Sequence, residues 1–158
     1  MSVTIDTCVL DERFAQLRHA TELYAVTWAS TTTVRRERGN DFPSDLPVTA
    51  ELATVGDSLV GYCRVANEFE VVRIGAIHRI ISNGSFTGFR SSALTSGQRR
   101  QVRDALVYEA HLHSGRDVFL TIDGKAFGDR TRDRLEALGP TRILTPDQLT
   151  ETLRAGTV

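Results

Sequence analysis

The sequence predicts a single α/β domain with a mainly parallel central sheet. Segments typical of strands alternate with segments typical of helices along most of the chain, and this alternation favours parallel strands joined by crossover helices. The chain has 158 residues, a length that fits one compact domain with its own core. With 41% hydrophobic and 25% charged residues, its composition is that of an ordinary globular protein rather than a disordered or fibrous one.

The N-terminal third is predicted to alternate between strands and helices. A short β-branched run opens the chain, and Asp6 falls at or just past its end. Glu37 lies on a short helix that directly follows the second strand, after a run of hydroxyl residues able to cap that helix. We expect a strand, a helix, a strand and a helix within residues 3–10, 11–23, 24–28 and 34–38.

The middle of the chain, residues 44–97, gives a mixed signal. Two prolines place a surface loop at 40–48. Residues 50–65 have the apolar spacing of a helix, which two glycines weaken. The segment 68–81 is rich in β-branched residues and is predicted to hold one or two strands, and the glycine- and serine-rich segment 82–97 to be a loop.

The clearest element of the C-terminal third is the apolar run 117–123, a buried strand that presents Asp123 at its carboxyl end, followed by Gly124. Before it, residues 99–114 have one broad apolar face and suit a helix ended by Gly115. After it we expect a helix, a strand and a helix at 125–138, 141–145 and 146–154.

Charge and targeting signals restrict the function classes. The formal net charge is −1 and the isoelectric point about 6.4, so nucleic-acid binding would need a local basic patch. Cys8 and Cys63 have apolar neighbours and are expected to be free thiols. The N-terminus has no basic region followed by a long apolar segment, so we expect no signal peptide, no membrane span and a cytoplasmic protein.

Four carboxylates are predicted to meet at one edge of the sheet. In a parallel sheet, strand C-termini and helix N-termini lie at the same edge, which is where ligands bind. Such a cluster repels itself unless it holds a cation, and hard oxygen ligands suit Mg²⁺ or Mn²⁺, ions that can activate water at a phosphodiester. The four residues are Asp6, Glu37, Asp104 and Asp123.

The segments that carry these acids resemble the acidic motifs of PIN-domain ribonucleases. They are VTIDTCVL with Asp6, STTTVRRERG with Glu37, RDALVYEAHLHSGRDVFLTID with Asp104, and FLTIDGKAFG with Asp123. The tail ILTPDQLTETL is similar to the usual last strand and helix of that family. The resemblance covers roughly residues 2–40 and 98–152, and leaves the middle unmatched.

The resemblance implies a three-layer α/β/α domain and a metal-dependent ribonuclease, often the toxin of a toxin–antitoxin pair. It implies Asp6, Asp104 and Asp123 as metal ligands and Glu37 as a further ligand or a water-positioning acid. Thr121, the hydroxyl residue of the Thr-x-Asp pattern, would orient a carboxylate or contact phosphate. Glu109 and Asp129 are held in reserve should the motif register differ.

The substrate implied is RNA, held by arginines. Arg35, Arg36 and Arg103 would guide the phosphate backbone together with Thr121, along with the neighbouring Arg38, Arg99 and Arg100. A solvated helix face explains the same arginines equally well. An antitoxin or other protein partner and a homodimer are both left open.

Each acid also has a plain structural interpretation. Asp6 could simply end a strand, Asp104 could interact with a helix dipole, and Asp123-Gly124 could be a turn. Glu37 lies among arginines and could form only local ion pairs. The alternative function is a catalytically inactive PIN-like binding or scaffolding module, with a flavodoxin- or receiver-like signalling domain ranked last.

Overall fold

A five-stranded parallel sheet forms the centre of the structure, with strand order β3-β2-β1-β6-β7. The computed structural model describes residues 1–53, 63–85 and 94–156. A separate two-stranded parallel sheet pairs β4 (Glu51–Leu52) with β5 (Cys63–Arg64). The strands of the central sheet are β1 (Ser2–Ile5), β2 (Thr27–Thr31), β3 (Val48–Thr49), β6 (Val118–Leu120) and β7 (Arg142–Leu144).

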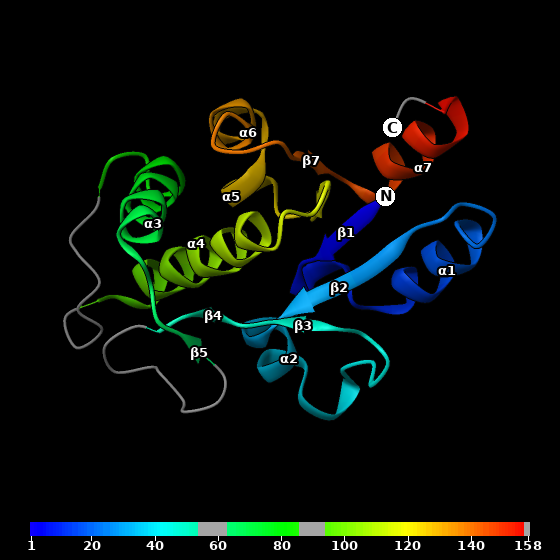
Figure 1. Ribbon diagram of the computed structural model, residues 1–158, viewed down its shortest axis with the longest axis horizontal. Coiled ribbons are helices and arrows are strands. Elements are labelled where there is room, and N and C mark those ends of the chain that lie inside the picture. The colour runs from blue at the N-terminus through cyan, green and yellow to red at the C-terminus, as the bar shows by residue number, and fades with distance from the viewer. Residues whose placement is uncertain (54–62, 86–93, 157–158) are drawn as a thin grey trace.

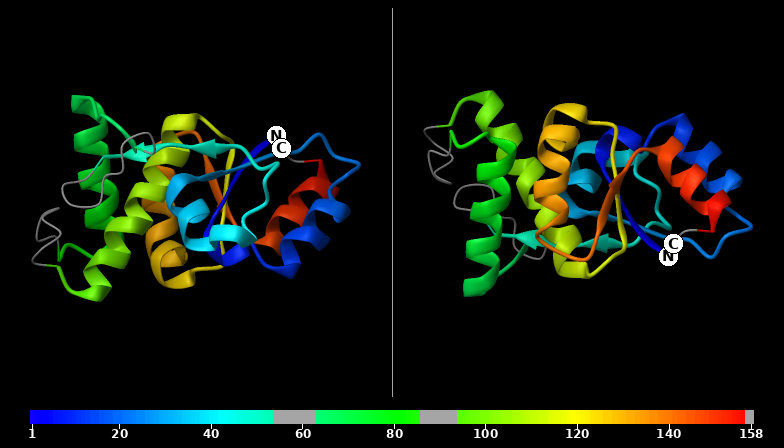
Figure 2. Two further views of the ribbon diagram at one scale, coloured as in Figure 1. Left: turned by 90° about the horizontal axis from the view of Figure 1, so that it is seen from below. Right: turned by 90° about the horizontal axis from the view of Figure 1, so that it is seen from above.

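Helices cover both faces of this sheet, which confirms the predicted three-layer α/β/α fold (Figure 1). On one side lie α1 (Glu12–Ala20) and α7 (Pro146–Ala155), which contact each other. On the other side lie α4 (Ser96–Ser114), α5 (Gly124–Phe127) and α6 (Asp129–Glu136), with α3 (Glu68–Ile81) packed outside α4 and α6 (Figure 2). The short helix α2 (Thr32–Arg38) follows β2 directly. Within the described ranges, no helix combines the length and apolarity needed to cross a membrane.

An aromatic cluster joins α4 to the sheet. Phe119 of β6 and Tyr108 of α4 are fully buried, and their ring centroids lie 5.2 Å apart with an edge-on geometry. Phe127 of α5 contacts the same Phe119 ring at 4.9 Å. His111, also on α4, bonds through Nδ1 to Thr4 Oγ1 of β1 at 2.8 Å, and burial lowers its pKa to about 3. The inner face of α4 is therefore held to β1 and β6 by both apolar and polar contacts.

The elements at the two ends of the chain match the prediction in type and order, although most strands are shorter. The strand predicted at 117–123 is paired only from Val118 to Leu120, and β2 lies several residues later than predicted. The helix predicted at 125–138 is split into α5 and α6. The break falls at Gly128, where a Cβ would lie 2.2 Å from the Gly124 carbonyl oxygen.

The middle of the chain departs from the prediction. The segment 68–81 is the helix α3, so the predicted strands are wrong. A reciprocal cap between Asn67 and Glu70 starts this helix, and its isoleucines fall on one buried face, so packing overrides the strand preference of β-branched residues. Residues 50–65 form β4 and β5 rather than a helix where they are described, and 54–62 lie outside the described residues. Of the predicted loop 82–97, residues 86–93 also lie outside them, and its last residues begin α4.

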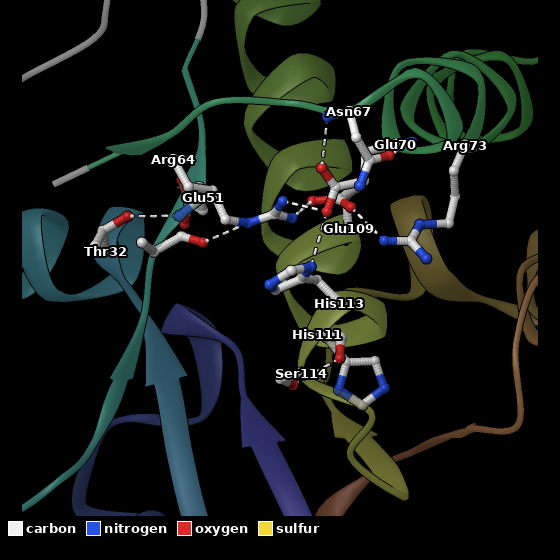
Figure 3. Close-up of polar contacts among 11 residues, drawn as sticks. Thr32, Glu51, Arg64, Asn67, Glu70, Arg73, Glu109, His111, His113 and Ser114 are labelled. Atoms are coloured by element: carbon white, nitrogen blue, oxygen red, sulfur yellow. Dashed lines mark hydrogen bonds and ion pairs between the residues drawn. The ribbon is translucent and has the colours of Figure 1, made fainter.

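A buried ionic cluster ties β5 and α3 to α4 (Figure 3). Glu109 of α4 is fully buried and forms ion pairs with Arg64 of β5 and with Arg73 of α3, the latter at 2.5 Å. Arg64 also pairs with Glu70 of α3, whose Oε1 lies 2.8 Å from His113 Nδ1 of α4. Because Glu109 is removed from water, its charge depends on the two arginines that contact it.

Replacing Glu109 should therefore destabilise the fold strongly. Glu109→Ala leaves Arg73 without a carboxylate partner among the described residues and leaves Arg64 with Glu70 alone. We expect a loss of about 3 kcal/mol in the free energy of unfolding, measured by urea denaturation. The exposed α7 variant Glu151→Ala is the control and should change stability by less than about 0.5 kcal/mol. Equal stability of the two variants would contradict a structural role for the cluster.

Candidate functional site

The two central strands of the sheet end at the point where the strand order reverses. The chain passes from β1 to β2, which pairs with one side of β1. The strand β6 pairs with the other side of β1, and the chain passes from β6 to β7 beyond it. In open α/β sheets this reversal opens a crevice at the carboxyl ends of the strands, and ligands bind there. Asp6 directly follows β1 and Asp123 follows β6, so both acids lie at the edge of the sheet where such a crevice is expected.

Asp6 is held by three side-chain hydrogen bonds. Its Oδ1 accepts from the Thr7 backbone amide at 2.7 Å, which caps the short 3₁₀ turn Thr7–Val9. Its Oδ2 accepts from Thr121 Oγ1 at 2.7 Å and from Cys8 Sγ at 3.2 Å. Burial raises the pKa of Asp6 even though these bonds oppose the shift, and the negative charge of Asp123 adds to it. The carboxylate is thus oriented but short of positive charge.

Asp123 is fixed by the helix that it begins. Its Oδ1 accepts from the backbone amides of Lys125 at 2.9 Å and Ala126 at 3.1 Å, at the start of α5. Its Oδ2 pairs with Arg100 Nη2 of α4 at 2.7 Å. Its own amide donates to Thr121 Oγ1 at 3.0 Å. The Thr121 hydroxyl therefore bridges the backbone of Asp123 and the carboxylate of Asp6.

Asp104, on α4, is near enough to Asp6 and Asp123 for their charges to act on its carboxylate. Within residues 1–53, 63–85 and 94–156, its carboxylate accepts no hydrogen bond and forms no ion pair within 4 Å. Burial, followed by the negative charges of Asp6 and Asp123, raises the pKa of Asp104 to about 7, while Arg100 and Arg103 oppose the shift. Asp6, Asp104 and Asp123 therefore form one electrostatically coupled group.

Glu37 lies at the edge of this group, exposed on α2. Its Oε2 accepts from Thr7 Oγ1 at 2.6 Å, and its Oε1 pairs with Arg103 Nη1 at 3.1 Å. Thr7 follows Asp6, so Glu37 connects to the crevice through one residue. The remaining predicted phosphate contacts, Arg35 and Arg36, lie exposed on the same helix.

The reserve acids lie apart from this group. Glu109 points the other way from α4, into the ionic cluster (Figure 3). Asp129 is exposed in the first turn of α6. Arg99, which was expected to flank the acids, directs its Nε to the Leu94 carbonyl instead at 3.2 Å.

Three residues that hold the predicted site residues or their helices in place were not predicted from the sequence: Thr7, Cys8 and Glu51. Thr7 and Cys8 could have been found as a hydroxyl and a thiol directly after a strand-ending aspartate. Glu51 gave no signal, because it lies about twenty residues from the helix that it serves. Its buried carboxylate accepts from the Thr33 amide at 2.9 Å and thereby caps α2, whereas the N-cap residue, Thr31, makes no side-chain capping bond. Burial raises the pKa of Glu51.

Carboxylate oxygens are the ligands that a hard divalent cation such as Mg²⁺ or Mn²⁺ prefers. Three partly shielded carboxylates share the crevice, and the oxygens of Asp104 have no partner among the described residues. In the present arrangement Arg100 and Arg103 partly neutralise the acids. Among residues 1–53, 63–85 and 94–156, however, no group of three or more His, Cys, Asp and Glu side chains is arranged to hold a metal ion. A cation here would compete with these guanidinium groups.

Comparisons with protein-family models, with curated proteins and with solved structures found no match. The functional assignment therefore depends on the chemistry of the crevice itself.

The raised pKa of Asp104 predicts that stability falls as the pH rises. Folding raises this pKa from 3.8 to about 7, so the folded state binds the proton more tightly than the unfolded state. The resulting stabilisation is complete below about pH 4 and is lost as the pH passes through 7. Asp104→Asn removes the charge at every pH. We expect it to match wild type at low pH and to exceed it at pH 8 by on the order of 2 kcal/mol in urea unfolding with a chelator present.

The matched control for this experiment is Asp133→Asn, an exposed acid on α6. It should follow the wild-type pH dependence. A wild-type chain and an Asp104→Asn variant that differ equally at low and high pH would contradict the raised pKa.

Proposed function

We propose that this protein is a divalent-metal-dependent ribonuclease of the PIN-domain kind, with Asp6, Glu37, Asp104 and Asp123 as its acidic residues. The observation that carries the proposal is electrostatic: the charge of Asp123 adds to the raised pKa of Asp6, and the charges of Asp6 and Asp123 add to the raised pKa of Asp104. An acidic cluster without equivalent positive charge is costly unless it serves to bind a cation.

Asp6, Asp104 and Asp123 would hold Mg²⁺ or Mn²⁺, which supplies activated water and stabilises the charge of the scissile phosphate. The protein's own part is orientation. Thr121 fixes one carboxylate oxygen of Asp6, and the start of α5 fixes one carboxylate oxygen of Asp123. Glu37 lies beyond Thr7 and would act as an additional ligand or hold the attacking water.

RNA is the proposed substrate. With a net charge of −1 the chain has no general attraction to nucleic acid, so the backbone must be drawn by a local group of arginines. Arg35 and Arg36 on α2 and Arg103 on α4 are exposed, and these are the arginines that would contact the phosphate backbone. The resemblance of the acidic motifs to PIN-domain ribonucleases supports RNA as the substrate and a toxin role with an antitoxin partner.

A second proposal is a PIN-like module that binds or scaffolds without catalysis. The observation that favours it is the pairing of Arg100 with Asp123 and of Arg103 with Glu37, which gives two acids internal counterions. If these pairs persist, the acids need no metal. Isothermal titration with Mn²⁺ separates the two proposals, because the scaffold should bind no metal at millimolar concentration.

Removing one carboxylate should weaken metal binding and lower the rate of RNA cleavage. We expect Asp6→Asn and Asp123→Asn to lower the rate of RNA cleavage with Mn²⁺ by about a hundredfold or more, the scale of losing one electrostatic group from a catalytic site. Titration calorimetry should show weakened Mn²⁺ binding in the same variants. Asp133→Asn, remote on α6, is the control and should cleave like wild type. Equal cleavage by all four proteins would overturn the ribonuclease proposal.

Arg100 should weaken the binding of the metal and strengthen the binding of RNA. Because its guanidinium pairs with Asp123, Arg100→Gln should tighten Mn²⁺ binding by up to about fivefold, the range of a solvent-exposed ion pair. The same variant should bind RNA more weakly and with a smaller salt dependence if Arg100 then contacts phosphate. Arg99→Gln is the neighbouring control and should leave Mn²⁺ affinity unchanged. Unchanged Mn²⁺ affinity in Arg100→Gln would show that the pair does not compete with metal.

A further inference from the structure

The inner face of α3 is fully engaged by the rest of the chain. Ile74, Ile77 and Ile81 are buried towards α4, and Arg73 contributes to the ionic cluster with Glu109 (Figure 3). The helix lies at the outer edge of the molecule, against α4 and α6 (Figures 1 and 2). The orientation of α3 is therefore fixed, and the face that it turns outwards is a fixed feature of the surface.

This outer face is apolar. Phe69 is 86% exposed and Val72 is 73% exposed, and their spacing with Ala76 places all three on one side of the helix. Val65, just before the helix, is 90% exposed. Of the six large hydrophobic side chains exposed in the described residues, four lie between Val65 and Val72. Single exposed apolar residues are normal, but such a concentration marks an interaction surface.

The centre of this face carries small residues. Gly75 lies in the middle of α3, where glycine weakens a helix relative to alanine. A Cβ at Gly75 would meet no atom within 4 Å, and its backbone is not in the left-handed region, so the chain's own packing does not require glycine. Together with Ala76, it gives this part of the face only small residues, against which the large side chains of another helix could pack.

The charged residues of α3 indicate which partner would bind this face. Glu68 is exposed at the start of α3 and Arg79 near its end, and neither forms an ion pair with a described residue within 4 Å. A second α3 running antiparallel places Glu68 opposite Arg79 of the other copy at both ends. The same register places Val72 opposite Gly75, because both pairs are centred between residues 73 and 74. Size and charge are thus self-complementary, as a two-fold interface requires.

We propose that the outer face of α3 is the interface of a homodimer in which two α3 helices pack antiparallel. This proposal is independent of the ribonuclease proposal. A 14-residue helix is about 21 Å long, so this contact is small for a protein interface. The expected product is a reversible dimer whose population rises with protein concentration.

Sedimentation velocity across a range of micromolar concentrations tests the dimer. For wild type, the average mass should rise from 17.5 kDa towards twice that value. Val72→Arg should weaken dimerisation by about tenfold or more, because Val72 is central to the face. Leu23→Arg, at a side chain 97% exposed beyond α1, is the matched control and should dimerise like wild type. A wild type that stays monomeric, or equal weakening by both variants, would overturn the proposal.

Charge reversal tests the antiparallel arrangement and distinguishes a second copy from another partner. Glu68→Arg and Arg79→Glu should each weaken the dimer, because like charges then face each other, and the double variant should restore it. Gly75→Gln should raise the thermal midpoint of the dilute monomer while weakening dimerisation, which separates the interface from fold stability. Failure of the double variant to restore dimerisation would overturn the antiparallel pairing.

Discussion

The parallel pairing of β1 with β6 is the constraint on which the rest of this structure depends. These strands are distant in sequence, yet their backbone ladder continues past β1, where the Asp6 amide donates to the Leu120 carbonyl at 3.0 Å. This pairing brings Asp6 next to Thr121, and it creates the reversal of strand order at which the crevice lies. The aromatic cluster centred on Phe119 packs α4, the helix that carries Asp104, against the same pair of strands.

The crevice concentrates negative charge at a cost to stability. Asp104 has a raised pKa because burial and two neighbouring acids disfavour its charge, and Asp6 is affected in the same direction. The fold neutralises this negative charge only in part, through the ion pairs of Arg100 with Asp123 and of Arg103 with Glu37. Because this compensation is partial, the acids retain negative charge that a cation could neutralise.

The ends of the chain could be predicted from the sequence because each signal there is local. An apolar run closed by Asp123, a cap before α7 and Gly115 after α4 each determine structure within a few residues. The convergence of the acids followed from a general rule about parallel sheets. What the prediction could not supply was the partner of each acid, because the contact of Arg100 with Asp123 depends on how α4 is placed against β6.

The middle of the chain could not be predicted because its structure depends on contacts between residues distant in sequence. Residues 68–81 have the composition of strands, and their helix depends on a cap at Asn67 and on burial against α4. Arg64 and Glu109 meet across a long sequence separation, and no pattern in either segment indicates the other. Tertiary packing therefore decides this region, as it commonly does where local preference is weak or mixed.

The capping of α2 by Glu51 makes two parts of the chain inseparable. Because Thr33 donates its amide to a carboxylate that comes from β4, the helix that carries Glu37 is completed by a residue from the middle of the chain. Recombination between α2 and β4 would leave a buried amide without an acceptor. The middle segment is consequently not an insertion that can be exchanged independently of α2.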